Sequence, residues 1–185
     1  MTFPEGDSAD RWTRPLLLVG CGLPAELEQW LAAAAPPLAA WLDLPLQRLG
    51  GEPASALAAL QAAGPTLAWL PLDPGCWQGG CGTWVEALGA WRQPTLALIP
   101  APQLAAGQAA ALTALLRQER VPLLGLLQLG GEWQAEARRA DALPWLGHWP
   151  ADSAPGAAEA EAAEAALDAL ELVMEARLQE LLAQL

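Results

Sequence analysis

The residues best placed to do chemistry form a short glycine turn, Gly20-Cys21-Gly22, between two apolar segments. The run 16–19 precedes the turn, and a helical pattern that begins at Pro24 follows it. A strand, a glycine turn and a helix together frame a phosphate-binding loop, because free N–H groups at the start of a helix attract anions. However, the chain contains no lysine, and Leu23-Pro24-Ala25 stands where such a loop has its Lys and Ser/Thr. The frame is present, and the side chains that bind phosphate and Mg²⁺ are missing.

Two acids argue further against a phosphate at this turn. Glu26 and Glu28 open the helix at which a triphosphate would dock, so like charges would meet there. Acids in a first helical turn are favourable for the helix itself, because they compensate its dipole. We therefore expect an ordinary strand-to-helix turn and not residual anion binding by the backbone.

The three cysteines, Cys21, Cys76 and Cys81, offer a second chemistry. Loops that follow neighbouring parallel strands share one edge of a sheet, so we expect Cys21 and Cys76 at the same edge. A metal could then be held by the three thiolates with Asp73 as a fourth ligand. The Cys-x₄-Cys spacing is not a usual zinc pattern, and no histidine is close in sequence. We expect free or buried thiols, no metal and no cofactor.

Composition and charge limit the class of partner. The chain has 185 residues, nine basic and 21 acidic, and a net charge of −12. A strongly acidic protein is a poor ligand for nucleic acid or for an anionic membrane surface. Proline, glycine or charge interrupts the apolar runs before they reach the roughly 18–20 residues of a membrane span. With an acidic start that does not match a signal peptide, we expect a cytoplasmic protein.

Residues 1–14 are expected to be flexible, residues 15–150 to form one α/β domain, and residues 157–185 to form a long C-terminal helix. Apolar runs alternate with helical patterns along the domain. Predicted strands are 16–19, 41–46, 67–70, 95–99, 123–129 and 143–147. Predicted helices are 24–35, which stops at Pro36-Pro37, then 53–63, 83–91, 102–118 and 132–140. Strands that are apolar on both faces indicate a parallel sheet covered on both sides. The sequence predicts a three-layer α/β fold with a mostly parallel sheet of five to six strands.

Several segments, in a common order over residues 16–150, resemble dethiobiotin synthetase, an ATP-dependent enzyme of biotin synthesis with a P-loop NTPase-like fold. Residues 83–100 resemble its helix and strand after an acidic glycine loop. The segments 121–127 and 143–150 resemble its valine/proline strand and its Leu-Pro-x-Leu-Gly-x-x-Pro segment. Leu44-Pro45-Leu46-Gln47-Arg48 resembles its Lys-Pro-Val-Gln-Thr. The resemblance implies a P-loop-like fold and a dimer.

The departures from this family fall on its functional positions. Leu44 stands for the lysine of Lys-Pro-Val-Gln, and Arg48 stands for the threonine. Only Asp73 could replace the carboxylate of the acidic loop, and Leu129 stands at the asparagine that reads adenine. Phosphoryl transfer depends on positioning and charge neutralisation, which these changes remove. The degenerate nucleotide loop comprises Gly20, Cys21, Gly22, Arg48 and Asp73, and we expect no catalytic residue.

Candidate protein contacts come from one loop and one helix. Trp77 lies in a glycine-rich loop and is the tryptophan most expected to be exposed, and exposed Trp residues mark interfaces. The last helix has apolar residues at a/d spacing, which either pack on their own sheet or bind a second chain. They are Leu167, Leu170, Met174, Leu178, Leu181 and Leu185.

The function expected from these features is that of a non-catalytic dethiobiotin-synthetase-like protein, a protein-interaction, scaffold or regulatory module. Its partner would be a second copy or another protein. The alternatives are a divergent ATP-dependent ligase of biotin or cofactor synthesis, and a small-ligand sensor that uses the old active-site pocket. His148, the single histidine, has no nucleophile motif near it and is not expected to be catalytic.

Overall fold

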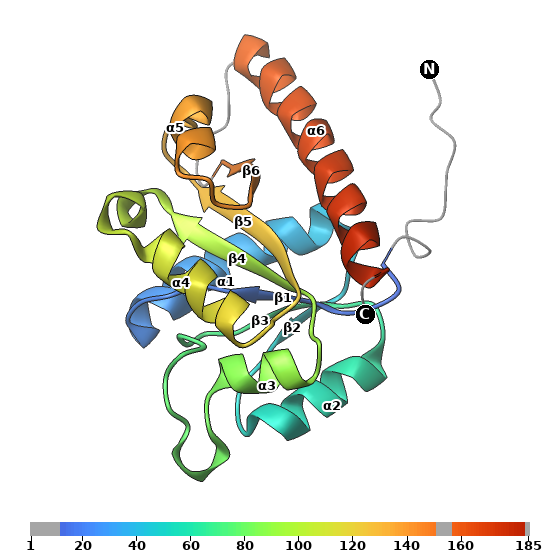
Figure 1. Cartoon of the computed structure of the whole chain (residues 1–185). Coiled ribbons are helices and arrows are strands. Elements are labelled where there is room, and N and C mark those ends of the chain that lie inside the picture. The colour runs from blue at the N-terminus through green and yellow to red at the C-terminus, as the bar shows by residue number, and fades with distance from the viewer. Residues whose placement is uncertain (1–11, 151–156, 184–185) are drawn as a thin grey trace.

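The structure is a computed structural model that describes residues 12–150 and 157–183, with the side chains of 157–164 left out (Figure 1). Six strands form one sheet in the order β2-β3-β1-β4-β5-β6, and every neighbouring pair is parallel. The strands are β1 Leu16–Val19, β2 Leu46–Arg48, β3 Leu67–Trp69, β4 Thr95–Pro100, β5 Leu123–Leu129 and β6 Trp145–Trp149. The prediction of a parallel α/β sheet is confirmed, and the sheet is parallel throughout.

Helices cover both faces of this sheet and make three layers (Figure 1). On one face α1 (Pro24–Trp41) and α6 (Ala157–Leu182) bury their apolar residues against β1, β3, β4 and β5. On the other face α2 (Pro53–Ala63), α3 (Trp84–Ala90) and α4 (Gln108–Gln118) do the same. A short helix, α5 (Ala135–Ala140), precedes β6. Strands such as Leu16–Val19 are wholly buried because both of their faces meet helices.

The prediction that the first helix stops at Pro36-Pro37 is wrong, because α1 continues through both prolines to Trp41. Each proline removes one helical hydrogen bond and crowds the carbonyl four residues earlier. Both prolines lie on the exposed face of the helix, so water can satisfy the carbonyls that they orphan. The buried face continues without interruption through Ala34, Ala35, Leu38 and Ala39. Tertiary packing of that face outweighs the local breaker.

Other boundaries also differ from expectation. The predicted helix 132–140 begins at Ala135, and the predicted strand 143–147 is Trp145–Trp149. The second strand starts after Pro45 and not before it, because Leu44 is buried in the core and the ladder runs from Leu46 to Arg48. The predicted helix 102–118 is two elements, the 3-10 helix η3 (Ala101–Ala106) and α4. Gly107, at φ +71°, separates them. A left-handed glycine cannot continue a right-handed helix, so the chain changes direction there.

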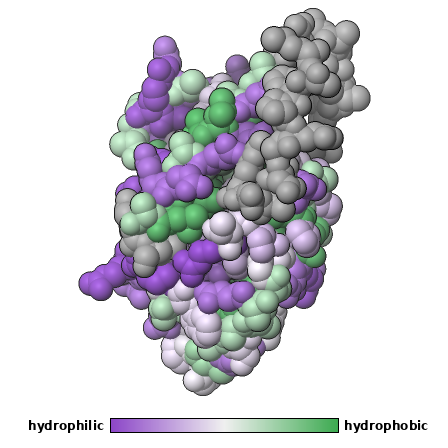
Figure 2. Space-filling view, turned by 90° about the vertical axis from the view of Figure 1, so that its right-hand side faces the viewer, coloured by the Kyte–Doolittle hydropathy of each residue, from purple (hydrophilic) through white to green (hydrophobic). Residues whose placement is uncertain are grey.

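The stripe of α6 is core and not surface. Leu170, Met174 and Leu178 are 3%, 0% and 4% exposed and pack against strands of their own chain. As possible interface residues these three are therefore wrong, because one face of the sheet would be open to water without them. Leu181 is partly exposed, and Leu185 lies outside the described residues. The side of the molecule in Figure 2 mixes hydrophobic and hydrophilic residues over its visible part.

Two further expectations concern the flexibility of residues 1–14 and the absence of a membrane-spanning helix. Of the stretch 1–14, residues 1–11 lie outside the described residues. Trp12 is only 3% exposed and belongs to the same core as α6, so flexibility does not extend to it. Within the described residues, no helix is long and apolar enough to cross a bilayer.

Candidate functional site

The glycine turn lies in the middle of the carboxyl edge of the sheet. β1 is flanked by β3 and β4. The chain forms β2 and β3 on one side of β1, and then β4, β5 and β6 on the other side. Ligands of open parallel sheets bind at such a point, where the loops of neighbouring strands separate. The turn after β1 and the loop after β3 are at the same edge, as the sequence predicted for Cys21 and Cys76. The position is that of a ligand site, so its contacts decide what it can bind.

Both glycines of the turn have structural reasons to be glycine. Gly22 has φ +135°, a conformation that a residue with a side chain adopts only with strain. A Cβ on Gly20 would collide with the ring of Trp30, which packs from α1 directly onto the turn. In a phosphate-binding loop, the empty space beside such a glycine lets the backbone approach the ligand. In this protein the indole of Trp30 fills the space beside Gly20.

The carboxylate of Asp73 closes the turn from the other side. Oδ2 accepts a hydrogen bond of 3.2 Å from the backbone N–H of Gly22, and Oδ1 accepts one of 2.9 Å from Gly75. Asp73 therefore links the loop after β1 to the loop after β3. A backbone N–H that already donates to a carboxylate is not available to a phosphate, and the carboxylate would repel one.

Gln103 of η3 holds the turn from a third direction. Its Nε2 donates to the carbonyl oxygen of Cys21 at 3.0 Å. The Cys21 thiol is half-buried, and burial together with the nearby charge of Asp73 raises its pKa to about 11. A thiol with such a pKa is protonated near neutral pH, so it is neither a nucleophile nor a ready metal ligand.

The three cysteines do not form a metal site. All three are free thiols, which agrees with the expectation of free or buried thiols; Cys21 is half-buried, and Cys76 and Cys81 are exposed. Among the described residues, no three His, Cys, Asp or Glu side chains come together in a way that could hold a metal ion. The exposed thiols flank Trp77 in a loop that extends away from the sheet.

Arg48 is bound by one of the acids that the sequence placed at the turn. Its Nη2 lies 2.7 Å from Oε2 of Glu28 and its Nε lies 3.0 Å from Oε1, a two-pronged pair on the surface. The guanidinium also stacks over Trp69 at 5.5 Å from the ring centroid. Hydrogen bonding to Arg48 lowers the pKa of Glu28 below its ordinary value. The cation that could have compensated for the missing lysine is thus engaged elsewhere.

Two hollows adjoin the turn. A cavity of about 400 Å³ is lined by Cys21, Gly22, Asp73 and residues of α4. On the opposite face a groove of about 780 Å³ lies between α1 and the carboxyl ends of β4, β5 and β6. Its walls include Trp30, Pro37, Pro100, Leu129 and Trp149, so it is mostly apolar. Leu129, expected at the adenine-reading position, belongs to this groove.

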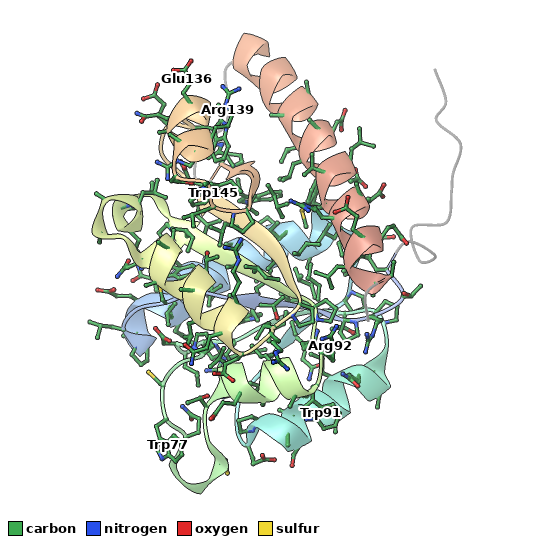
Figure 3. The ribbon with its side chains drawn as sticks, in the orientation of Figure 1. Trp77, Trp91, Arg92, Glu136, Arg139 and Trp145 are labelled. Carbon is green, nitrogen blue, oxygen red and sulfur yellow. The ribbon has the colours of Figure 1, made fainter. Side chains whose placement is uncertain are left out.

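Trp77 is exposed, as expected, at 68% of its surface. The loop that carries it leaves β3 and extends away from the sheet (Figure 3). Trp77 forms an isolated antiparallel bridge with Thr83, and the N–H of Gln78 donates to the carbonyl oxygen of Gly82 at 2.8 Å. Thr83 and Glu86 form a capping box that fixes the start of α3 just beyond the loop. The indole is therefore presented by an ordered loop.

Sequence reasoning missed one residue of this site and one pairing. Gln103 contacts Cys21 across 82 positions of the chain, and no local pattern announces such a contact. The pairing of Glu28 with Arg48 depends on α1 lying over the edge strand β2. The resemblance motif gave Arg48 a place at the site but no partner.

The fold and the site together define a parallel three-layer α/β domain whose central ligand position is closed by its own side chains. A scan of the sequence against protein-family models finds no match. A search of the curated proteins finds no significant relative either.

Proposed function

We propose that this protein is a non-catalytic relative of dethiobiotin synthetase that works as a protein-interaction, scaffold or regulatory module. The observation that carries the proposal is the bond between Gly22 and Asp73. It puts a carboxylate of the chain at the backbone donor that a phosphate would need. An enzyme that binds ATP at this position would have to break that bond and displace the charge.

The remaining charges support the same conclusion. The chain has no lysine to neutralise the β- and γ-phosphates, and Arg48 is paired with Glu28. Removing one such contact from a transition state commonly costs about 3–4 kcal/mol, or a factor of 10²–10³ in rate. Several such losses at one site leave no basis for ordinary phosphoryl transfer.

The interaction surface in this proposal is the loop around Trp77. Buried aromatic anchors dominate binding energy at interfaces, and an ordered exposed indole loses little freedom on binding. The partner is a second copy of the chain or another protein, in the cytoplasm. With α6 packed into its own core, the dimer cannot use Leu170, Met174 and Leu178.

A phosphate-release assay tests the non-catalytic part. The purified protein is incubated with ATP and Mg²⁺, with and without diaminopelargonate, and the Arg48→Ala variant is measured in parallel. No release above background is expected from either protein. Turnover that is lost in Arg48→Ala would mean that the site had been rebuilt around arginine, and the divergent ligase would be the correct function.

A pull-down from the source cell tests the interaction part. The wild-type chain, a Trp77→Ser variant and a Trp91→Phe control serve as baits. The proposal expects a partner that Trp77→Ser loses and the control keeps, with identical unfolding curves for Trp77→Ser and wild type. A partner retained by Trp77→Ser, or an exclusively monomeric protein that recovers none, contradicts it.

The apolar groove favours a second candidate, a small-ligand sensor. At about 780 Å³ it has the size of small-molecule pockets and lies at the carboxyl edge of the strands, where such ligands bind. Trp30 and Trp149 would report an apolar ligand through their fluorescence. Ala33→Trp should fill the groove and abolish the response, and a titration that gives the same change in both proteins argues against this use.

A further inference from the structure

A second concave site lies at the opposite edge of the sheet, where the strands begin. It is a cavity of about 380 Å³ lined by four arginines, Arg92, Arg117, Arg120 and Arg177. Its floor is formed by the residues that lead into β5, from Val121 to Leu124, together with Pro144 and Leu181. The glycine turn, Asp73 and the Trp77 loop are all at the other edge, so this cavity is separate from the site described above.

The concentration of arginine is unusual for this chain. Four of its nine arginines line one cavity, and among the described residues Glu180 is the one acid that lines it with them. The molecule as a whole carries a net charge of −12. A local excess of positive charge in such a protein needs a reason other than solubility.

The arginines come from three different elements. Arg92 follows the end of α3, Arg117 and Arg120 are at the end of α4, and Arg177 belongs to α6. α3 and α4 are helices that cross over between parallel strands, so both run back to the edge where the next strand starts. α6 follows β6, and its Arg177 lines the same cavity. Figure 3 shows Arg92 at the end of α3, far from Arg139 on α5. The cluster is thus a product of the fold and not of one basic segment.

Within the part of the chain that the structure describes, two of these guanidinium groups have no acid paired with them. Arg117 and Arg120 make no side-chain hydrogen bond or ion pair with any described residue. Arg177 is paired with Glu180 at 3.0 Å, and both side chains are more than half exposed. The cavity therefore contains donors that a ligand could engage without breaking an internal ion pair.

Helix capping offers a competing explanation, since arginine near a helix C-terminus compensates the helix dipole. The end of α4, where Arg117 and Arg120 lie, contributes about −0.5 charge. Arg177 is offset by Glu180, so Arg117 and Arg120 leave a surplus of about +1.5 after this dipole is counted. Helix capping therefore accounts for part of the cluster, and the remaining positive charge is close to what a dianion would neutralise.

Backbone conformation makes the choice of arginine costly at two positions. Arg92 and Arg120 have φ +51° and +56°, in the left-handed region that favours glycine. Both helices end in the same way, because the N–H of the residue after each arginine donates to a carbonyl oxygen of the last helical turn. Gln93 donates to Leu88, and Val121 donates to Leu116. Asp43 and Ala142 show the same conformation at other helix ends, so the conformation itself is general in this protein. At the two ends that face the cavity, the residue is arginine.

The geometry points to a binding site for a small organic phosphate or diphosphate at this edge of the sheet. Guanidinium groups bind phosphate oxygens in a two-pronged way and keep their charge at any physiological pH. The apolar floor would contact the organic part of the ligand. The site is independent of the proposed function, and its ligand would regulate or accompany the protein without being turned over at the glycine turn.

Calorimetric titration of the full chain with inorganic pyrophosphate at low ionic strength tests this site. The double variant Arg117→Gln/Arg120→Gln should weaken binding by about tenfold or more. The matched control is Arg138→Gln/Arg139→Gln on α5, which removes the same charge elsewhere and should change affinity by less than about twofold. Equal weakening in both variants would mean general electrostatic attraction and would overturn the proposal, as would absence of binding to the wild type.

Two single variants separate binding from folding. Glu180→Gln removes the acid of the cavity and should tighten pyrophosphate binding by about threefold. Arg120→Gly should weaken binding while it leaves the protein at least as stable, because glycine relieves the left-handed strain. A short triglutamate peptide that binds more tightly than pyrophosphate would assign the cavity to an acidic peptide and contradict the phosphate assignment.

Discussion

The backbone nitrogen of Gly22 lies 3.2 Å from Oδ2 of Asp73, so the loops after β1 and β3 are tied together at the centre of the carboxyl edge. The same carboxylate accepts a second bond from Gly75 at 2.9 Å. In a nucleotide-binding loop the corresponding donors face outwards and meet a phosphate. An internal carboxylate at this position gives the loop a structural task instead, and that task can be measured.

Asp73→Ala should lower the free energy of unfolding by about 1–3 kcal/mol, because it leaves the N–H groups of Gly22 and Gly75 without their acceptor. Urea unfolding followed by tryptophan fluorescence measures the change. Asp73→Asn is the control, since it keeps one carbonyl acceptor and should cost less. Equal stability of Asp73→Ala and wild type would show that the bond does not hold the loops.

The role of α6 can be tested on two leucines of the same helix. Leu170 is 3% exposed and Leu172 is 68% exposed. Leu170→Ala should destabilise the protein by about 2–5 kcal/mol through lost burial and a cavity. Leu172→Ala should stay within about 0.5 kcal/mol of wild type. Comparable effects of the two changes would contradict the packing of α6 on the sheet.

The three cysteines should differ in their reaction with a thiol reagent. Cys76 and Cys81 are exposed and should be labelled first. The pKa of Cys21 is raised from 9.0 to about 11, so its thiolate fraction near neutral pH falls by about a hundredfold. Mass spectrometry should therefore find two labels quickly and the third slowly, with the third accelerating as pH approaches 11. Rapid labelling of Cys21 near neutral pH would refute the burial argument.

His148 should make stability depend on pH. Burial lowers the pKa of His148 in the folded protein below its ordinary value of 6.5, while a hydrogen bond with the backbone of Gly131 opposes the shift. The unfolded chain then binds the proton more readily, so the contribution to stability is full above about pH 6.5 and is lost as pH falls through the folded pKa. Unfolding curves near pH 7.5 and 5.5 should show this loss in wild type and less of it in His148→Gln. An identical loss in both proteins would assign the effect to other groups.

The regular parts of the fold could be predicted because their causes are local. The strand 123–129 and the helix 53–63 are found at the predicted bounds, since an apolar run entered through proline and a helix between Pro53 and Gly64 leave few alternatives. The helix from residue 157 is likewise present. The errors occur where distant packing overrides a local rule, as at Pro36 and Pro37 in α1.

The site was predictable only in position. The turn, Asp73 and Cys21 follow strands that a parallel sheet brings to one edge, and the alternation of elements was enough to place them there. Which atoms meet depends on loop conformation, so neither the bond from Gly22 nor the contact of Gln103 could be foreseen. The arginine cavity escaped notice because its members are spread from Arg92 to Arg177 and meet only when three elements are assembled.

The strand order has a consequence for how the chain reaches its native state. β1 is formed by residues 16–19, yet its two neighbours are β3 and β4, and the core that Leu16 and Leu18 enter also contains Leu170, Met174 and Leu178 of α6. Contacts between residues so far apart in sequence are slow to form, because the entropy of closing a long loop is lost before the contact contributes any stabilisation. A ribosome that has synthesised only the first five strands therefore carries a chain with an open apolar face, which is the kind of surface that chaperones bind and that aggregates. The core that contains Leu16 and Leu18 of β1 is therefore complete only when α6 has been synthesised and has packed on the sheet.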